Sequence, residues 1–175
     1  MIVGILKEIK PAENRVALTP AGVELMAAAG HDVLVQSGAG QGSGWDDGAY
    51  SQAGARLVAA AADIYAQAQM VMHVKEPLLS EYDLIRPGHI VFTYLHLGGN
   101  ETLTRALIKS QSVNIGYETI QKEDGSLPLL TPMSEVSGRM SIQQAAKYLE
   151  MAHGGRGVLL GGVPGGEPAT VLVLG

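Results

Sequence analysis

The chain has 175 residues, of which 46% are hydrophobic and 17% are charged, a composition typical of a folded globular protein and not of a disordered one. Its net charge of −5 and pI of about 5.5 come without a cluster of basic residues, so we expect no nucleic acid and no anionic membrane as a partner. The chain has no cysteine, which excludes disulfides, thiol catalysis and cysteine-based metal sites.

Short apolar and β-branched runs alternate along the chain with segments of helical periodicity. Thr19 followed by Pro20 predicts the start of a helix that ends at Gly30, and Asn100 predicts the N-cap of a later helix. Alternation of this kind predicts an α/β fold with a Rossmann-like, doubly wound parallel sheet. The predicted strands are residues 2–8, 32–38, 70–75, 89–96 and 113–120.

The composition changes after residue 121. A turn-rich loop leads to Ser134, which we predict to cap a long helix, and a glycine-rich connector follows that helix. The final "TVLVLG" is an apolar run followed by one glycine, which is how a dinucleotide-binding turn begins, but taken alone an ordinary strand and turn explains the pattern better. We therefore predict an α/β domain over 1–133, an interdomain helix and connector over 134–169, and the start of a second domain over 170–175.

The sequence contains no candidate for a membrane span or a secretion signal. The most apolar region, 57–74, is interrupted by Asp63 and by glutamines, whereas a span requires roughly 20 apolar residues. Lys7 and Glu8 follow too soon after the start for a signal-peptide core. We therefore expect a cytoplasmic protein.

The glycine-rich stretch "SGAGQGSGW", residues 37–45, follows a predicted strand and could be a phosphate cradle. Its glycines lie at every second position and do not match G-x-G-x-x-G, and no apolar helix opens after it. We predict an ordinary loop.

Three residues are candidates for a substrate site. Arg15 lies in the loop after the first predicted strand, while Lys75 and His96 lie at the ends of two later strands. The carboxyl ends of parallel strands meet at one edge, which is where open α/β sheets bind ligands. A guanidinium, an ammonium and an imidazole together would suit a small carboxylate with an adjacent carbonyl or amine.

Each of the three residues also has a structural interpretation. Arg15 could be a surface residue paired with Glu13, Lys75 a solvated strand end, and His96 a structural histidine. The remaining histidines do not share the predicted edge, and we interpret them as structural: His31, His73, His89 and His153. No spacing of carboxylates and histidines predicts a metal site.

Several motifs spread over the whole chain resemble the amino-terminal portion of bacterial alanine dehydrogenases, in the alanine dehydrogenase and nicotinamide nucleotide transhydrogenase family. They are "GILKEIKPAENRVALTP", "VMHVKEPL", "YLHL", "LPLLTPMSEVSGRMS" and "GGVPGGEPATVLVLG". The resemblance implies oxidative deamination of L-alanine to pyruvate and ammonia with NAD, the reverse reductive amination, and a homohexamer. It also implies that the sequence stops inside the cofactor motif of a second Rossmann domain, which binds NAD, so that these 175 residues would be inactive alone.

The resemblance implies roles for particular residues. Arg15 and Lys75 would bind substrate, Lys75 and His96 would take part in catalysis, and the domain over 1–133 would be the substrate-binding domain. Met133, Ser134 and Gly175 would contact the cofactor. Two alternatives stay open: the nucleotide-binding subunit of a proton-translocating transhydrogenase, which typically lacks the lysine and histidine found here, and a non-catalytic small-molecule binding module.

Overall fold

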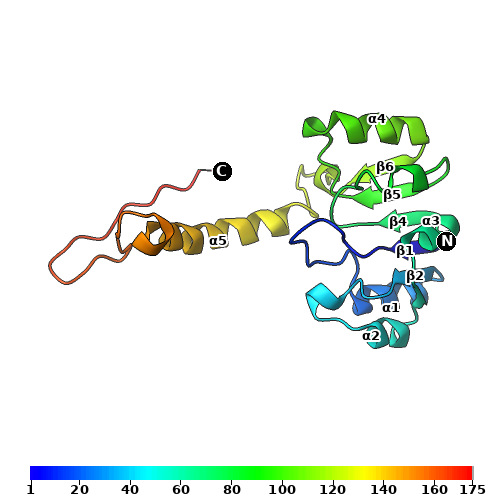
Figure 1. Cartoon of the computed structure of the whole chain (residues 1–175), viewed down its shortest axis with the longest axis horizontal. Helices are drawn as coiled ribbons and strands as arrows, with labels where there is room; N and C mark the ends of the chain where they lie inside the picture. Colours follow the sequence, from blue (N-terminus) through cyan, green and yellow to red (C-terminus); the bar gives the residue numbers. More distant parts are fainter. Residues whose placement is uncertain (175) are drawn as a thin grey trace. The chain divides into compact units, whose positions relative to one another are not determined.

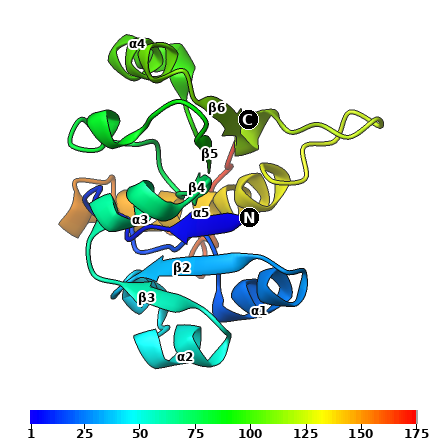
Figure 2. The same cartoon turned by 90° about the vertical axis from the view of Figure 1, so that its right-hand side faces the viewer.

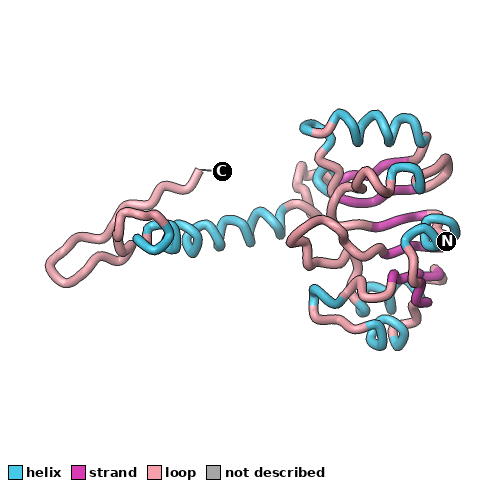
Figure 3. Tube along the Cα trace, in the orientation of Figure 1, coloured by secondary structure: helices cyan, strands magenta, loops and turns pink. Residues whose placement is uncertain are grey.

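The computed structural model describes residues 1–174, and the chain divides into two compact units, Met1–Ile120 and Gln121–Gly175. The first unit contains all the described strands, and the second consists of one long helix followed mainly by loop (Figures 1 and 3). Gly175, the predicted first glycine of the cofactor turn, lies outside the described residues.

The first unit is a doubly wound parallel sheet, as predicted. Its strands lie in the order β3-β2-β1-β4-β5-β6 and all pair in parallel (Figure 2). The chain runs outward from β1 to β3 and then returns to place β4 on the other side of β1, so the topological switch point lies between β1 and β4. The strands are β1 (Ile2–Ile5), β2 (Asp32–Gln36), β3 (Arg56–Val58), β4 (Met70–Met72), β5 (Ile90–Thr93) and β6 (Val113–Gly116).

Helices cover both faces of this sheet. Alternate side chains of β1 and β2 enter two apolar clusters, one with Val23 and Tyr50 from α1 and α2, the other with Ile64 and Leu103 from α3 and α4. Four short helices therefore bury a sheet whose strands are apolar on both faces. The helices of this unit are α1 (Pro20–Ala28), α2 (Asp47–Gln52), α3 (Ala61–Gln67) and α4 (Glu101–Ser110), and the second unit contains α5 (Thr131–Leu149).

The capping residues of two helices are confirmed. The Thr19 side chain accepts a hydrogen bond from the Gly22 amide at the start of α1, and Asn100 accepts one from Leu103 at the start of α4. Gly30, just past the end of α1, has φ = +82°, a conformation that glycine adopts without strain.

The predicted strands are too long at their carboxyl ends. β4 stops at Met72 and β5 at Thr93, so Lys75 and His96 lie three residues beyond their strands and not at the last strand positions. A further strand, β3, was not predicted, because three residues leave almost no periodic pattern. The apolar content of the sequence predicted that these strands exist. Where each strand ends depends on where the ladder of backbone hydrogen bonds stops.

Two predictions for the second unit are wrong. The long helix begins at Thr131, one turn before Ser134, with a proline in its first turn, so Ser134 is not its cap. Residues 170–174 are irregular and form no strand. A strand needs a neighbour for its hydrogen bonds, and no other strand occurs among the described residues of this unit.

Candidate functional site

The three predicted site residues lie on loops that leave the carboxyl edge of the sheet in the first unit. Arg15 follows β1, Lys75 follows β4 and His96 follows β5, and these strands are neighbours at the switch point. The order of the strands thus puts all three loops at the position where such sheets bind ligands.

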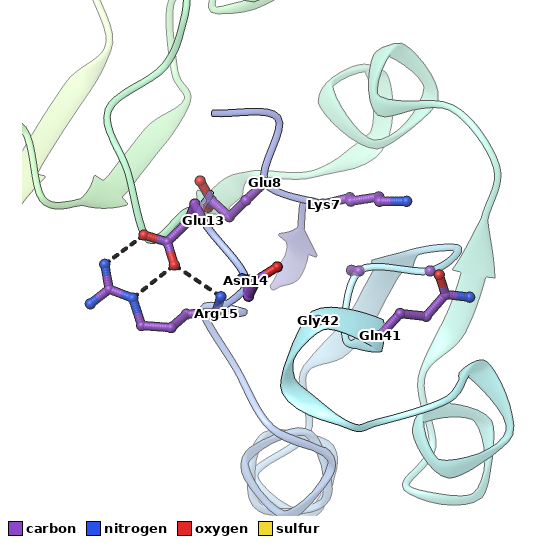
Figure 4. Close-up of a pocket in the computed structure, with 9 residues that line it drawn as sticks. Lys7, Glu8, Glu13, Asn14, Arg15, Gln41 and Gly42 are labelled. Atoms are coloured by element: carbon purple, nitrogen blue, oxygen red, sulfur yellow. Dashed lines mark hydrogen bonds and ion pairs between the residues drawn. The ribbon is translucent and has the colours of Figure 1, made fainter. Parts of the chain in front are cut away.

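Arg15 is held by Glu13 two residues before it. The Glu13 carboxylate accepts hydrogen bonds from Arg15 Nε at 2.8 Å, Arg15 Nη2 at 2.6 Å and the Arg15 backbone amide at 2.9 Å (Figure 4). The hydrogen bond from the Arg15 side chain, reinforced by the charge of Lys75, lowers the pKa of Glu13. The pairing considered as the structural interpretation of Arg15 is therefore present, and it also fixes the guanidinium in one orientation.

A pocket of about 170 Å³ opens between the loop after β1 and the loop after β2 (Figure 4). Arg15, Glu13 and Glu8 line one part of it, and Gly42 lines another. A Cβ on Gly42 would come within 2.6 Å of the Asn14 carbonyl oxygen, so the glycine lets the two loops approach closely. The stretch 37–45 is the predicted loop, with one 3-10 turn at Gln41–Ser43; Gly40 and Gly42 allow close packing, whereas Gly38 and Gly44 have positive φ. Lys75 and His96 do not line this pocket.

Lys75 is half-buried, and its ammonium makes no ion pair with any residue among 1–174. Its backbone, by contrast, is anchored on both sides. The amide donates to Glu8 Oε2 at 3.3 Å, and the carbonyl accepts from Thr93 Oγ1 at 2.9 Å. A rigid backbone with an ammonium that retains its hydrogen-bonding capacity is suited to binding an anionic or carbonyl oxygen.

His96 is exposed and adopts φ = +49°, ψ = +39°, a left-handed conformation that is uncommon for a residue with a side chain. Its ring stacks on Tyr94, with centroids 6.2 Å apart and planes 18° apart. Its amide donates to Glu118 at 2.8 Å. The backbone turn sends His96 out of the strand direction and leaves its imidazole accessible from solvent.

Electrostatic contacts link the three loops. The charge of Arg15 acts on Tyr94, whose ring stacks on His96, and the charge of Lys75 acts on Glu13. The predicted residues therefore lie near enough for their charges to act within one neighbourhood of the first unit.

A second carboxylate in this neighbourhood, that of Glu76, is also paired with a cation. Burial alone would raise the pKa of Glu76, but the hydrogen bond from Lys10 and the nearby charge of His96 hold that pKa below its ordinary value. Like Glu13, Glu76 therefore carries its charge opposite a cation, which reduces its repulsion of an incoming anion.

The predicted cofactor contacts lie in the second unit. Met133 and Ser134 are in the first turns of α5 and line a pocket of about 580 Å³ together with Ser137, Gly138 and Ser141. Apolar side chains and serine hydroxyls are a suitable lining for a flat, amide-bearing ring.

Three residues at the sheet edge were not predicted: Glu8, Tyr94 and Glu118. Glu8 and Glu118 bind the backbone of the loops after β4 and β5, and Tyr94 supports the His96 ring. Glu118 lies two residues after the end of β6 at Gly116, but the predicted strand over 113–120 included it, so no sequence signal identified it. Glu8 was assigned to the first strand, although β1 ends at Ile5.

Neither a metal site nor a membrane span is visible in the described residues. No group of three or more histidine, aspartate or glutamate side chains among residues 1–174 could hold a metal ion. No described helix is long and apolar enough to cross a membrane.

Two family models match the chain. "Alanine dehydrogenase/PNT, N-terminal domain" matches residues 4–137, and "Alanine dehydrogenase/PNT, C-terminal domain" matches residues 141–175. The chain belongs to the alanine dehydrogenase/PNT family. The two models meet inside α5, whereas the compact units divide after Ile120. The predicted boundary at 133/134 lies between these positions and stays a prediction.

Relatives within the alanine dehydrogenase/PNT family match the entire chain. An alanine dehydrogenase of Methanococcus maripaludis is 55% identical and one of Geobacillus stearothermophilus 53% identical, each over 175 residues that make up 47% of the relative. The chain therefore spans about half the length of the curated relatives it matches.

Solved structures of the family agree with the sequence comparisons. An L-alanine dehydrogenase is 49% identical with a TM-score of 0.88, over 96% of this chain and 46% of that one. A transhydrogenase from Sinorhizobium meliloti is 35% identical with a TM-score of 0.64, over 67% of this chain and 35% of that one. The resemblance to alanine dehydrogenases stated from the motifs is confirmed, and the transhydrogenase is more distant than these relatives.

Proposed function

We propose that the chain is the amino-terminal part of an enzyme that converts L-alanine to pyruvate and ammonia with NAD and catalyses the reverse reductive amination. The single observation that carries the proposal is the placement of Arg15, Lys75 and His96 on the loops after three neighbouring strands at the switch point. The names of the relatives, at 53% and 55% identity, support the same substrate.

The side chains at the sheet edge match the groups of pyruvate and alanine. Arg15 offers a planar fork for the substrate carboxylate, and the Lys75 ammonium would bind the carbonyl oxygen and stabilise negative charge that develops there. His96 would take and return a proton at the reacting centre, because imidazole changes its charge near neutral pH. Holding the α-carbon in one orientation would contribute much of the rate.

NAD is the proposed cofactor, and the described residues fit it. The pocket along α5 combines the Met133 side chain with serine hydroxyls, which suits a nicotinamide ring and its amide. Met133 and Ser134 would hold that ring, and Gly175 would begin the pyrophosphate turn. When bound, NAD would supply the acceptor for the hydride that leaves the alanine α-carbon.

The transhydrogenase subunit is the second candidate, because the same family contains it. Lys75 and His96 favour the dehydrogenase: binding a nucleotide requires neither an ammonium nor an imidazole at this edge, whereas turning over a 2-oxo acid uses both. We also propose a homohexamer in the cytoplasm, which light scattering and cell fractionation of the full-length gene product would test.

Assays of the full-length gene product test the function. We expect NAD reduction with L-alanine, slow turnover of glycine and still slower turnover of bulkier amino acids, because a methylene is worth only about 1–3 kcal/mol in a small pocket. Equal rates with leucine and alanine would contradict the alanine site. Hydride transfer from NADH to NADP without any amino acid would favour the transhydrogenase, and an absence of any turnover would favour the binding module.

A further inference from the structure

Glu118 binds the loop that carries His96. It lies two residues after the end of β6, and its Oε1 atom accepts hydrogen bonds from the backbone amides of Leu95 at 3.0 Å and His96 at 2.8 Å. These amides belong to the loop after the neighbouring strand β5. Consecutive amides that converge on one anion form a concave backbone arrangement, and extended strand geometry does not allow it.

The backbone of His96 needs such support. Its left-handed conformation is unfavourable for a residue with a Cβ, and the surroundings must therefore hold it in place. Because His96 is exposed, burial of its own side chain does not supply that support. The hydrogen bond to Glu118 holds the His96 amide in place.

Glu8 does the same for the loop that carries Lys75. Its carboxylate accepts hydrogen bonds from the amides of Val74 at 2.6 Å, through Oε1, and Lys75 at 3.3 Å, through Oε2. The Glu8 side chain is only 4% exposed and lies 3.7 Å from Nδ1 of the buried His73. His73 is in turn placed by the Tyr65 hydroxyl, 3.0 Å from its Nε2 atom.

The two arrangements repeat one design. In each, a carboxylate from beyond one strand accepts hydrogen bonds from two amides that lie beyond the end of the adjacent strand: Glu8, after β1, binds the loop after β4, and Glu118, after β6, binds the loop after β5. Each carboxylate thereby turns its neighbour's loop at the residues that lead to Lys75 or His96. Burying a charged carboxylate costs free energy unless the carboxylate receives such hydrogen bonds. The conformation of each loop is therefore coupled to the charge of the carboxylate that binds it.

We infer that Glu8 and Glu118 are positioning residues that aim Lys75 and His96 at the substrate, without touching the substrate themselves. The inference rests on the proposed function, because it takes Lys75 and His96 to be the groups that bind and turn over a 2-oxo acid. Glu8 and Glu118 would then belong to the machinery of the site, and the hydrogen bonds that they accept explain why the chain leaves strand geometry before Lys75 and His96.

The two carboxylates differ in one testable detail. Glu118 Oε1 accepts from both amides, and only Leu95 also approaches Oε2, at 3.3 Å, so a Glu118→Gln variant with its amide oxygen in place of Oε1 keeps an acceptor for both amides. Glu8 uses both oxygens, so Glu8→Gln replaces one acceptor with a donor facing an amide. Gln is therefore expected to rescue position 118 and to fail at position 8.

The test is titration of the 175-residue chain with pyruvate, well below its unfolding temperature. The variants are Glu118→Ala, Glu118→Gln, Glu8→Ala and Glu8→Gln. The control is Glu101→Gln, because Glu101 is an exposed carboxylate that pairs with Arg105. We expect both alanine variants and Glu8→Gln to weaken pyruvate binding about tenfold, while Glu118→Gln and Glu101→Gln stay within about twofold of wild type. NMR spectra of each variant report whether the sheet is folded and whether His96 keeps its strong intraresidue amide–Hα contact.

The outcomes separate the two claims. Equal pyruvate affinity of wild type and folded alanine variants would overturn the positioning role while leaving the substrate site intact. If wild type itself binds no pyruvate, the proposed function fails, and the positioning role fails with it. Loss of the His96 amide–Hα contact in Glu118→Ala, together with weaker binding and rescue by Gln, is the result the inference predicts.

Discussion

Arg15 already holds a carboxylate before any substrate arrives. The Glu13 carboxylate accepts hydrogen bonds from two nitrogens of the Arg15 guanidinium, and the Glu13 side chain is only 8% exposed. A substrate carboxylate must share this guanidinium with Glu13 or displace it, so the pair sets the affinity of the site as well as its geometry. Such a pair is also sensitive to acid.

The Glu13 pair should stabilise the fold only above acidic pH. Hydrogen bonding from Arg15 holds the pKa of Glu13 below its ordinary value of 4.5 in the folded state. The ionised carboxylate therefore stabilises the fold at neutral pH, and this contribution is lost as the pH falls below that value. Glu13→Gln should lower the free energy of unfolding, measured in urea, at about pH 7, and this loss should become smaller as the pH is lowered to about 3. An equal effect at both pH values would contradict the pairing, and Glu101→Gln, in a pair that is 77% exposed, is the control with a small effect.

His96 should determine a limb of the pH profile in the full-length gene product. We expect His96→Ala to lower kcat/KM steeply and to remove the limb near neutral pH, since imidazole is the group that titrates there. His153→Ala, at an exposed histidine after α5, is the control and should preserve the limb. A His96→Ala enzyme that retains both turnover and the limb would exclude His96 as the acid/base group.

At the scale of elements, helix starts were predictable and strand ends were not. Thr19 and Asn100 are local signals, because a cap acts within one turn of its own helix. The apolar residues Val74 and Leu95 continue the strand pattern, but their amides donate to Glu8 and Glu118 and not to a ladder. Those partners are distant in sequence, so no local pattern contains them.

The two caps should differ in strength. Asn100 accepts from Leu103 at 3.0 Å, whereas Thr19 accepts from Gly22 at 3.4 Å, near the limit for a hydrogen bond. Asn100→Ala should cost about 1 kcal/mol of unfolding free energy and Thr19→Ala less. Urea unfolding of both variants measures the difference, and a larger loss for Thr19→Ala would contradict it.

Gly4 should be intolerant of any side chain. It lies in β1, and a Cβ there would overlap the Ile64 side chain of α3 and come within 3.1 Å of Ala68. Gly4→Ala should destabilise the first unit by about 1–3 kcal/mol, as overpacking does. In the double variant with Ile64→Ala, the loss should be smaller than the sum of the single losses, because the overlap is removed. Additive losses would contradict a direct clash.

For the whole molecule, the sequence was sufficient to place Arg15, Lys75 and His96 at one edge, because parallel strands share their direction. It was insufficient to identify Glu8 and Glu118, since their role depends on which strands are neighbours, and the order β3-β2-β1-β4-β5-β6 becomes visible only in the structure. In the second unit the apolar pattern of residues 170–174 predicted a strand that needs a partner to form.

We propose that the carboxyl edge of the first unit binds a small 2-oxo acid through Arg15 and Lys75. The most direct test of this proposal is calorimetric titration of the chain with pyruvate, comparing wild type with Arg15→Lys and Lys75→Ala. Lys109→Ala is the matched control, because it removes an exposed positive charge at the end of α4, where the chain leads into the opposite edge of the sheet.

We predict that wild type and Lys109→Ala bind pyruvate with equal affinity. We predict that Arg15→Lys and Lys75→Ala bind it at least about tenfold more weakly, because the first loses the bidentate guanidinium fork and the second loses a charge-assisted contact. Equal affinity in all four proteins would contradict pyruvate binding through Arg15 and Lys75.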